Sequence, residues 1–569
     1  MFRKAFYLFT LGVLLAACSR DAEPVGPAKQ LVERPVSESP DAVGAADGIP
    51  SDRPYEKLEP GFAGSDSCIE CHKHEHQTWH ASYHRTMTAE PTPETVKGNF
   101  DRQQAAAYGI SCEMTHDAQG YYARIFDATK SQEVQIALMT GSHHMQMYWF
   151  PAGELRNLAI LPVVYLMEAK RWIPRDAVFL EPLRYDHNFQ VSQWSTICIR
   201  CHTTQPNPAF SWQSGQVFGP LAAMDTHVAE FGIACESCHG PAAEHVRLRL
   251  ASGEAPDPDP IVLPTDLAPD RMSVVCGKCH GLSLLNPKRE QQFYEHGRVL
   301  RPGMDLSDAG YTIWDQMNNR DHPEVVKRNA ERPETVPMSF WGDGMIRVSG
   351  REYNGLINSP CFLHDNPEQQ MSCMSCHTMH QGKKDPRPAK EWANDQLKPG
   401  MYGNPACLQC HDTYTDEAVL TAHTHHPADS LGSTCYNCHM PYTTYGLLKA
   451  IRSHTITSPS AQETQAHGRP NACSHCHLDR SLAWAGEHLQ AWYGIEQPRF
   501  SPEETAVPAS LVALYAGDAG QRALAAWAMG WADARETSGA DWLARALMEV
   551  LNDPYHAVRY IAQQIGRAH

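Results

Sequence analysis

Apolar side chains near the C-terminus recur at helical spacing, and this pattern predicts an α-helical segment over residues 481–569. One predicted helix face contains Leu524, Trp527, Ala528 and Trp531. A second predicted face contains Leu543, Ala546, Leu547 and Val550. A turn at Asp553-Pro554 then precedes another amphipathic start, "YHAVRYIAQQIG". These helices are expected either to bury their apolar faces by stacking on one another or to cap the preceding domain.

Residues 61–480 show few long amphipathic stretches, and the fold expected there is mainly α with much irregular structure. A first insertion alternates apolar and polar residues in "YYARIFD", "EVQIALM", "HHMQMYWF" and "LPVVYLMEAKRWIP", which predicts a small β insertion. A second insertion, around "FYEHGRVLRPGMDL" and "FWGDGMIRVSGREYNGL", mixes turns with short extended pieces. Scaffolding, a substrate pocket and a docking face for a partner remain open as roles for both insertions.

The N-terminus has the features of an export signal. A basic start at Arg3 and Lys4 leads into an apolar run that ends at Cys18 in "LAAC", as in a bacterial lipoprotein signal peptide over residues 1–18. A plain secretory signal and a short membrane helix are the alternatives, although the run is short for a membrane span. Residues 19–60 are rich in Pro, Ala, Asp and Glu and predict a flexible tether. We expect a periplasmic protein that a lipid anchors to a membrane. Ser19 favours the outer membrane over the inner one, and a position at the cell surface is the alternative.

The sequence Cys-x-x-Cys-His occurs eight times, whereas chance would give roughly 0.03 copies. We number these motifs 1 to 8 in chain order. Their cysteines are Cys68 and Cys71, Cys198 and Cys201, Cys235 and Cys238, Cys276 and Cys279, Cys373 and Cys376, Cys407 and Cys410, Cys435 and Cys438, and Cys473 and Cys476. Their histidines are His72, His202, His239, His280, His377, His411, His439 and His477.

This spacing is that of haem c attachment. Two thiols three residues apart can add to the vinyl groups of one haem, and the next histidine is placed to bind its iron from the proximal side. A zinc site needs four ligands from paired Cys-x-x-Cys units and no obligatory histidine after each pair. Eight His-terminated repeats therefore predict eight covalently bound haem c groups over residues 61–480, rather than zinc sites or a disulfide framework.

The charge balance limits the classes of molecule that the protein is expected to bind. The formal net charge of −17 argues against nucleic acid, which recruits basic patches. Redox partner proteins, such as other cytochromes or a quinol-side donor, are the expected contacts, and basic surfaces on them would suit this charge.

Eight of the 31 histidines are proximal, so 23 remain for the distal side of the haems. Electron-transfer haems usually have a second strong ligand, often histidine. A histidine a few residues from a proximal one cannot pass around that porphyrin, so His74, His76, His245 and His380 could only ligate a neighbouring haem. Sharing ligands in this way would force the haems into close pairs.

The segments "WHASYHRTM", "ACESCHGPAAEH", "CHTMH", "STCYNCHMPYTTYG", "AIRSHTI" and "PNACSHCH" resemble motifs of bacterial multihaem cytochromes c of the doubled Cys-x-x-Cys-His type, related to the tetrahaem cytochrome of ammonia oxidisers. Several members carry a C-terminal TPR or HEAT-like array, and the helical tail resembles HEAT repeats. The resemblance implies that His84, His245, His380 and His454 are distal ligands. It also favours His426, with His423 as a second candidate. Weaker candidates for the other haems are His143, His144, His227 and His296.

Three histidines, His423, His425 and His426, lie together in "TDEAVLTAHTHH", which predicts a short helix from Thr415 or Asp416 that frays before Pro427. On a continuous helix His423 and His426 would share a face, and His425 would point elsewhere. This arrangement predicts one ligand (His426), one contender (His423) and one bystander (His425).

Three functional hypotheses remain. The first is an electron-transfer cytochrome with closely packed, mostly bis-histidine haems. The second is an octahaem oxidoreductase that acts on nitrite, hydroxylamine or a sulfur oxyanion at one five-coordinate haem, with Arg298, Tyr353 and His364 as pocket candidates. All eight motifs end in histidine, which weakens the resemblance to ammonia-forming nitrite reductases. The third is an assembly subunit that uses the helical tail. Cys112 and Cys361 are left over, either as a disulfide or as free thiols.

Overall fold

The computed structural model describes residues 50–566, with gaps at 51, 108, 153–154, 179–192, 212–222 and 253–257. The predicted signal peptide (1–18) and most of the predicted tether (19–60) lie outside the described residues. The end of the tether belongs to the fold, because β1 (Tyr55–Glu56) pairs in parallel with β13 (His227–Phe231). Among the described helices, none is long and apolar enough to cross a membrane.

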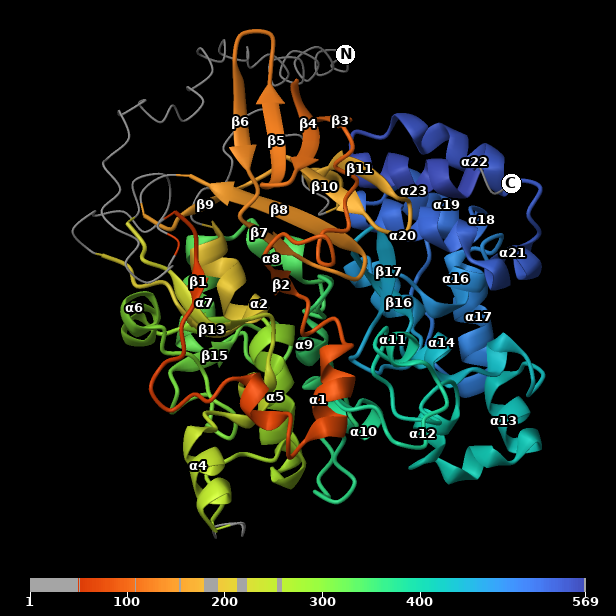
Figure 1. The fold of residues 1–569 in the computed structure, drawn as a ribbon. Helices are drawn as coiled ribbons and strands as arrows, with labels where there is room; N and C mark the ends of the chain where they lie inside the picture. The colour runs from red at the N-terminus through yellow and green to blue at the C-terminus, as the bar shows by residue number, and fades with distance from the viewer. Residues whose placement is uncertain are drawn as a thin grey trace, which may run out of the picture.

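The first insertion forms two antiparallel sheets, drawn in orange at the top of Figure 1. One has the order β3-β4-β5-β6, with strands Gln103–Ala107, Ile110–Asp117, Gly120–Phe126 and Ser131–Gln135. The other has the order β11-β10-β8-β7-β2, with β9 paired to β8; its strands are β2 Thr88–Ala89, β7 Leu138–Thr140, β8 Met145–Pro151, β9 Leu158–Ile160, β10 Val163–Leu166 and β11 Arg171–Pro174. In β4 the buried residues Ile110, Cys112 and Met114 alternate with more exposed ones, as half-buried strands require. All four segments predicted to be extended contain strands.

Short helices carry the eight motifs, because one or two turns are enough to present two cysteines and a histidine. The helices that contain or adjoin motif residues are a 3-10 helix at Ser65–Cys68, α1 Lys73–His80, α2 Ile199–His202, α3 Cys235–His239, α5 Pro269–His280, α10 Cys373–Cys376, α12 Pro405–Leu408, α14 Cys435–His439 and α16 Ala472–Cys476. Connecting helices are α4 Ala243–Ser252, α9 Glu352–Leu356, α11 Ala389–Trp392, α13 Glu417–Thr424 and α15 Ala461–His467. Two antiparallel strand pairs complete this region: β12 Thr203–Asn207 with β13, and β16 Tyr442–Gly446 with β17 Lys449–Arg452.

The second insertion is more helical than its turn-rich sequence predicts. It contains β14 Ser283–Leu285, α6 Pro287–His296, β15 Tyr311–Ile313, α7 Pro323–Glu331 and α8 Thr335–Ser339. Asn286 caps α6 by accepting from the Arg289 N–H, Pro287 occupies the first turn, and Gly297 ends the helix with φ 60°. These start and stop signals were present in the sequence.

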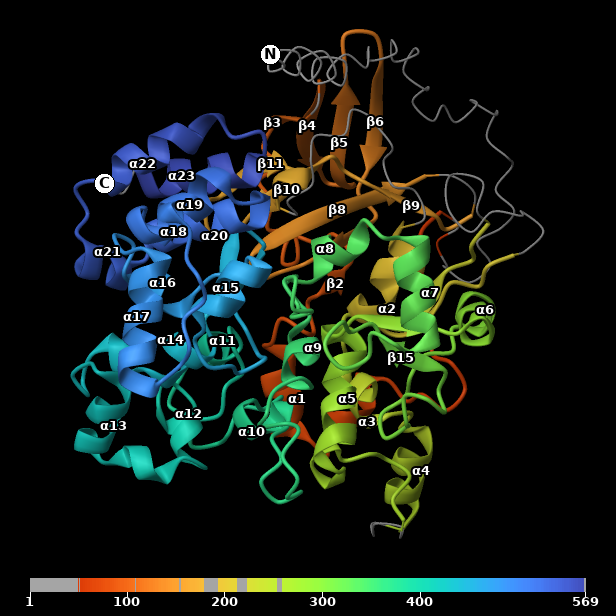
Figure 2. The same ribbon diagram turned by 180° about the vertical axis from the view of Figure 1, so that it is seen from behind.

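Residues from 482 onward form the helices visible in blue in Figures 1 and 2. They are α17 Leu482–Tyr493, α18 Pro502–Ala506, α19 Ala509–Ala516, α20 Ala519–Gly530, α21 Ala532–Ser538, α22 Leu543–Glu549 and α23 His556–Gly566. Leu524, Ala528, Leu543 and Leu547 are buried in one apolar cluster, as the helical spacing predicts. The same cluster includes Tyr445 of the haem region, so the tail packs directly on that region. Its identity as a HEAT array stays a prediction.

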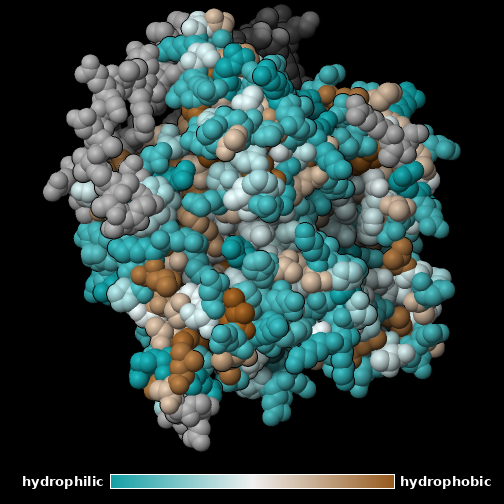
Figure 3. Space-filling view, in the orientation of Figure 1, coloured by the Kyte–Doolittle hydropathy of each residue, from teal (hydrophilic) through white to brown (hydrophobic). Residues whose placement is uncertain are grey.

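The surface is mostly hydrophilic on the face drawn in Figure 3, with hydrophobic residues scattered over it. Leu250 and Leu263 are among the exposed apolar side chains. The largest concentration of potential ligand-binding groups instead lies inside the molecule.

Candidate haem-binding site

One cavity of about 2930 Å³ extends through the region of the motifs. Pockets for single drug-sized ligands are roughly 300–1,000 Å³, so this space suits several large groups. Cysteine or histidine side chains from all eight motifs line it. The lining also includes the predicted distal ligands His84, His245, His380, His426 and His454. The donor set and the volume therefore fit several haem c groups.

Three of the proximal histidines are oriented by hydrogen bonds from Nδ1 to backbone carbonyl oxygens. His239, His377 and His439 donate from Nδ1 to backbone carbonyl oxygens of Val262 (2.8 Å), Asp395 (2.9 Å) and Thr457 (3.2 Å), respectively. A neutral imidazole that donates from Nδ1 keeps Nε2 free to bind a metal, and such outer hydrogen bonds fix the ring orientation.

Five proximal histidines each face a second histidine ring at a nearly constant separation. The centroid distances are 6.3 Å for His72–His245, 6.3 Å for His239–His380, 6.4 Å for His280–His84, 6.2 Å for His439–His423 and 6.2 Å for His477–His426. Metal–imidazole bonds are about 2.0 Å and a ring centroid lies about 1.1 Å behind its nitrogen, so two imidazoles on one iron have centroids about 6.2 Å apart. The spacing suits bis-histidine ligation.

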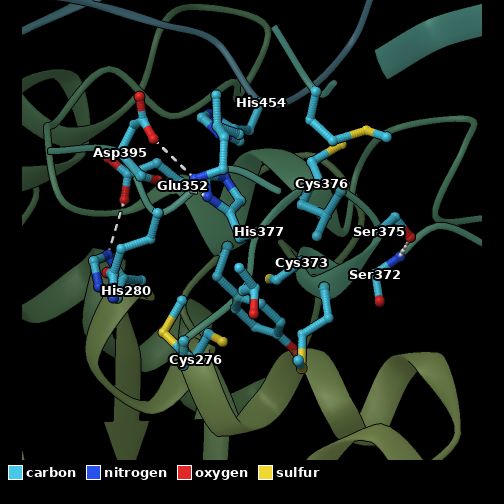
Figure 4. A pocket seen from close by; sticks show the side chains of 18 of the residues that line it. Cys276, His280, Glu352, Ser372, Cys373, Ser375, Cys376, His377, Asp395 and His454 are labelled. Carbon is cyan, nitrogen blue, oxygen red and sulfur yellow. Dashed lines mark hydrogen bonds and ion pairs between the residues drawn. The ribbon is translucent and has the colours of Figure 1, made fainter. Parts of the chain in front are cut away.

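The predicted distal histidines show the same Nδ1 pattern. His245 donates to Asp259 Oδ1 (2.8 Å), His380 to the Glu75 carbonyl oxygen (3.2 Å), His426 to that of Thr424 (2.6 Å) and His454 to that of Arg452 (3.2 Å). His454 lies beside His377 in the close view of Figure 4. Burial lowers the pKa of His377, and the charge of His454 lowers it further. The proximal histidine of motif 5, His377, therefore lies close to His454, its predicted distal partner.

The three clustered histidines differ from the expected arrangement. Helix α13 begins at the predicted cap, Asp416, but it ends at Thr424, and His425 has left-handed backbone geometry with φ 57°. His426 therefore does not share a helix face with His423, and each faces a different proximal histidine. His425 stacks on Trp492 with ring centroids 4.2 Å apart. The helix was predicted two residues too long, so the shared face was wrong.

The cysteine sulfurs, which would carry the thioether bonds, form a connected series. Side-chain hydrogen bonds join Cys68 to Cys235, Cys201 to Cys279, Cys276 to Cys373 and Cys407 to Cys435. Cys238, Cys410 and Cys438 also lie close enough to Cys276, Cys376 and Cys473, respectively, to raise the pKa of those thiols. The motifs are therefore neighbours in the order 1-3-4-5-6-7-8, and motif 2 branches from motif 4.

Motifs 2, 5 and 6 differ from the other five. In the described part of the chain, no second histidine ring is paired with His202, His377 or His411 at the separation seen elsewhere, although the charge of His454 acts on His377. Burial lowers the pKa of His202 to about 4. The β insertion borders motif 2, since Trp149 and Ile160 pack with Ile199 and Cys198.

Several other candidates occupy different places. His143 and His144 line the cavity and stack on each other, and His143 also stacks on Tyr83. His227 uses both ring nitrogens, toward Asp225 and Glu59, and like His296 it does not line the cavity. His74 places its Nε2 on the Gln381 carbonyl oxygen, which is incompatible with iron ligation by that nitrogen in this conformation.

The residues nominated for the pocket of the oxidoreductase hypothesis also lie in different places. Tyr353 and His364 line the cavity, whereas Arg298 does not. Tyr353 is buried against Gly277 of α5, where a Cβ would collide with its ring. Cys112 and Cys361 are both free thiols, so they form no disulfide. Cys361 lies near Cys376 and Cys410, whereas Cys112 is buried in the β insertion.

Sequence reasoning missed two carboxylates that accept hydrogen bonds from predicted ligand histidines. Glu352 Oε2 accepts from His280 Nδ1 at 3.1 Å, and Asp259 accepts from His245. Burial by itself would raise the pKa of Glu352, but the hydrogen bond and charge of His280 bring it down to about 2. Glu352 lies in the second insertion, and its distance in the sequence from the motifs gives no sign that it contacts His280.

Repeated haem-attachment motifs around one shared cavity, with paired histidines, define a multihaem cytochrome c. No protein-family model matches the chain. It is 21% identical over 404 residues to the dissimilatory sulfite reductase MccA of Wolinella succinogenes, covering 62% of this chain and 50% of that relative. The chain thus matches half the length of the relative. The crystal structure of the outer cell wall cytochrome OcwA is similar with a TM-score of 0.48 and 18% identity, over 89% of this chain and 99% of that one.

Proposed function

We propose that this protein is an exported, lipid-anchored octahaem cytochrome that transfers electrons through closely packed, mostly bis-histidine haems. The observation that supports it most strongly is the connected series of motif sulfurs from Cys68 to Cys473. Thioether sulfurs sit at the porphyrin edge, so adjoining sulfurs bring porphyrin edges together. Haem supplies one-electron chemistry when bound, and the chain supplies ligands, hydrogen bonds and burial that set each potential.

The points of electron entry and exit are proposed at the exposed motifs. Among the motif cysteines, Cys71 and Cys410 are the exposed ones. Residues 399–448 around Cys410 contain four acidic residues and no Lys or Arg. A basic redox partner protein would be attracted to such a surface, and the attraction would weaken as salt is added.

The test is a haem count on the purified protein combined with EPR spectroscopy. Pyridine haemochrome analysis should give eight haems per chain, and EPR should show mainly low-spin bis-histidine iron. Rapid oxidation of the reduced protein by a basic cytochrome should slow as ionic strength rises. Fewer than eight haems, or mostly high-spin iron, would contradict the proposal.

A second function is favoured by the separate character of motif 2. Its haem would end a branch, and no described histidine pairs with His202. With the similarity to a sulfite reductase, these observations favour reduction of a sulfur or nitrogen oxyanion there. A high-spin EPR signal that shifts on addition of sulfite, nitrite or hydroxylamine would support this function. Its absence in protein with eight low-spin haems would exclude it.

A further inference from the structure

The proximal histidine of motif 4 differs from its counterparts in the group that it donates to. His280 donates to the carboxylate of Glu352 at 3.1 Å, whereas His239, His377 and His439 donate to neutral backbone carbonyls. Figure 4 shows this carboxylate between His280 and the pair His377 and His454. One proximal ligand is thus backed by a full negative charge.

The protein holds that carboxylate firmly in place. Glu352 begins helix α9, and its other oxygen, Oε1, accepts from the Gly350 N–H at 3.0 Å. Glu352 and His280 both line the cavity, so their solvent-exposed portions, 27% and 49% of the side chains, face the space that suits haem. The neighbouring guanidinium of Arg351 donates to the carbonyl oxygens of Cys279 and Gly350 rather than to Glu352.

A second carboxylate provides an internal comparison. Asp259 accepts from His245, the predicted distal ligand of motif 1, but its other oxygen accepts from Arg249 at 3.1 Å. The arginine offsets much of the negative charge of Asp259. Among the described ion pairs, Glu352 is joined only to His280.

We infer that Glu352 is a positioning residue that gives the haem of motif 4 the lowest reduction potential in the chain. A negative charge beside a ligating imidazole makes that ligand a stronger donor and stabilises ferric over ferrous iron. The step involved is the one-electron reduction of Fe(III) to Fe(II), with no bond made or broken at Glu352. Replacing the carboxylate by an amide removes the charge and should raise the potential.

The position of motif 4 among the other motifs determines how a low potential there would affect electron transfer. This step rests on the proposed electron-transfer function. Motif 4 adjoins motifs 2, 3 and 5 through Cys279, Cys238 and Cys373. Electrons that move between the two arms, or to motif 2, must pass its haem. The haem of motif 4 is therefore reduced last at equilibrium and is occupied by an electron only briefly in transit.

The test is an EPR-monitored redox titration of the full-length haem-loaded protein and its Glu352→Gln variant. We expect the component with the lowest potential to move upward so that its reduction is at least tenfold more favourable, about 59 mV for one electron, with the other components unchanged. Asp259→Asn should move a different component by less, and Asp308→Asn, at an exposed site, should move none. Glu352→Asp, which keeps the charge, should restore much of the wild-type value.

The haem count and spin state are measured first, so that the two proposals are separated. Eight low-spin haems together with an unmoved lowest component in Glu352→Gln would overturn the role of Glu352 and leave the electron-transfer proposal intact. A uniform shift of all components would also overturn it, since that indicates a general charge effect. A wrong haem count in the wild-type protein would instead contradict the proposed function.

Discussion

The cluster His423, His425 and His426 allows the distal-ligand assignments to be tested within four residues. We consider three single substitutions to alanine in the full-length haem-loaded protein. His423 faces His439 and His426 faces His477, each at 6.2 Å between ring centroids. His425 instead stacks on Trp492, which makes His425→Ala a matched control in the same turn.

The fraction of haem expected to change spin state in each variant follows from the number of irons that the removed ring would ligate. His423→Ala and His426→Ala should each convert one haem of eight, or one eighth of the total, from low spin to high spin. The double variant should convert two, because the partners belong to different motifs. His425→Ala should leave every haem low spin and lower the free energy of unfolding by about 0.5–1.5 kcal/mol through the lost ring contact.

The assay is EPR with spin quantitation, supported by the high-spin absorption band of ferric haem and by a haem count. Equal conversion by His423→Ala and His426→Ala, with conversion of two haems to high spin in the double variant, would support the assignment. If the double variant converted one haem, the two histidines would serve the same iron. If His425→Ala changed the spin state, the ring-pair reasoning would be refuted.

Three contacts away from the haem irons give further tests. Arg522→Ala leaves the buried carboxylate of Asp553 without its 2.6 Å partner, so thermal or urea unfolding should show a loss of about 3–5 kcal/mol. Gly232→Ala places a Cβ against the Arg85 carbonyl oxygen at φ 76° and should lower the melting temperature, whereas Gly494→Ala, at φ 70° with open space, should cost less. Burial lowers the pKa of His144 to about 4, so the unfolded chain binds a proton there first, and stability should fall as pH drops from 6.5 towards 4. His144→Asn should flatten that part of the pH profile in urea titrations, and an unchanged slope would contradict this explanation.

The haem attachment sites could be predicted because their chemistry is local. Two thiols and a histidine within five residues form a motif whatever the surrounding fold is, so their assignment needs no tertiary information. His245 and His380 could also be nominated, because a nearby residue cannot reach around its own porphyrin. The structure places both against a neighbouring motif, at 6.3 Å from His72 and His239.

Other parts of the site depend on contacts between distant segments. His84 and His280 are nearly 200 residues apart, and their pairing follows a resemblance rather than any spacing rule. Glu352 was missed for the same reason, since its partner His280 lies in another segment. The pairing of His423 with His439 was not expected from the sequence, because one residue in left-handed geometry, His425, ends the helix early. Such a helix end without glycine gives little sequence signal.

The shared cavity has a consequence for how the protein is made. Its lining residues run from Cys68 to Ile495, so the walls of the cavity come together only when segments distant in the sequence have folded against one another. Each pair of thiols lies within one short segment, so thioether bonds can form before that assembly is complete. We therefore expect haem attachment to precede compaction of the chain.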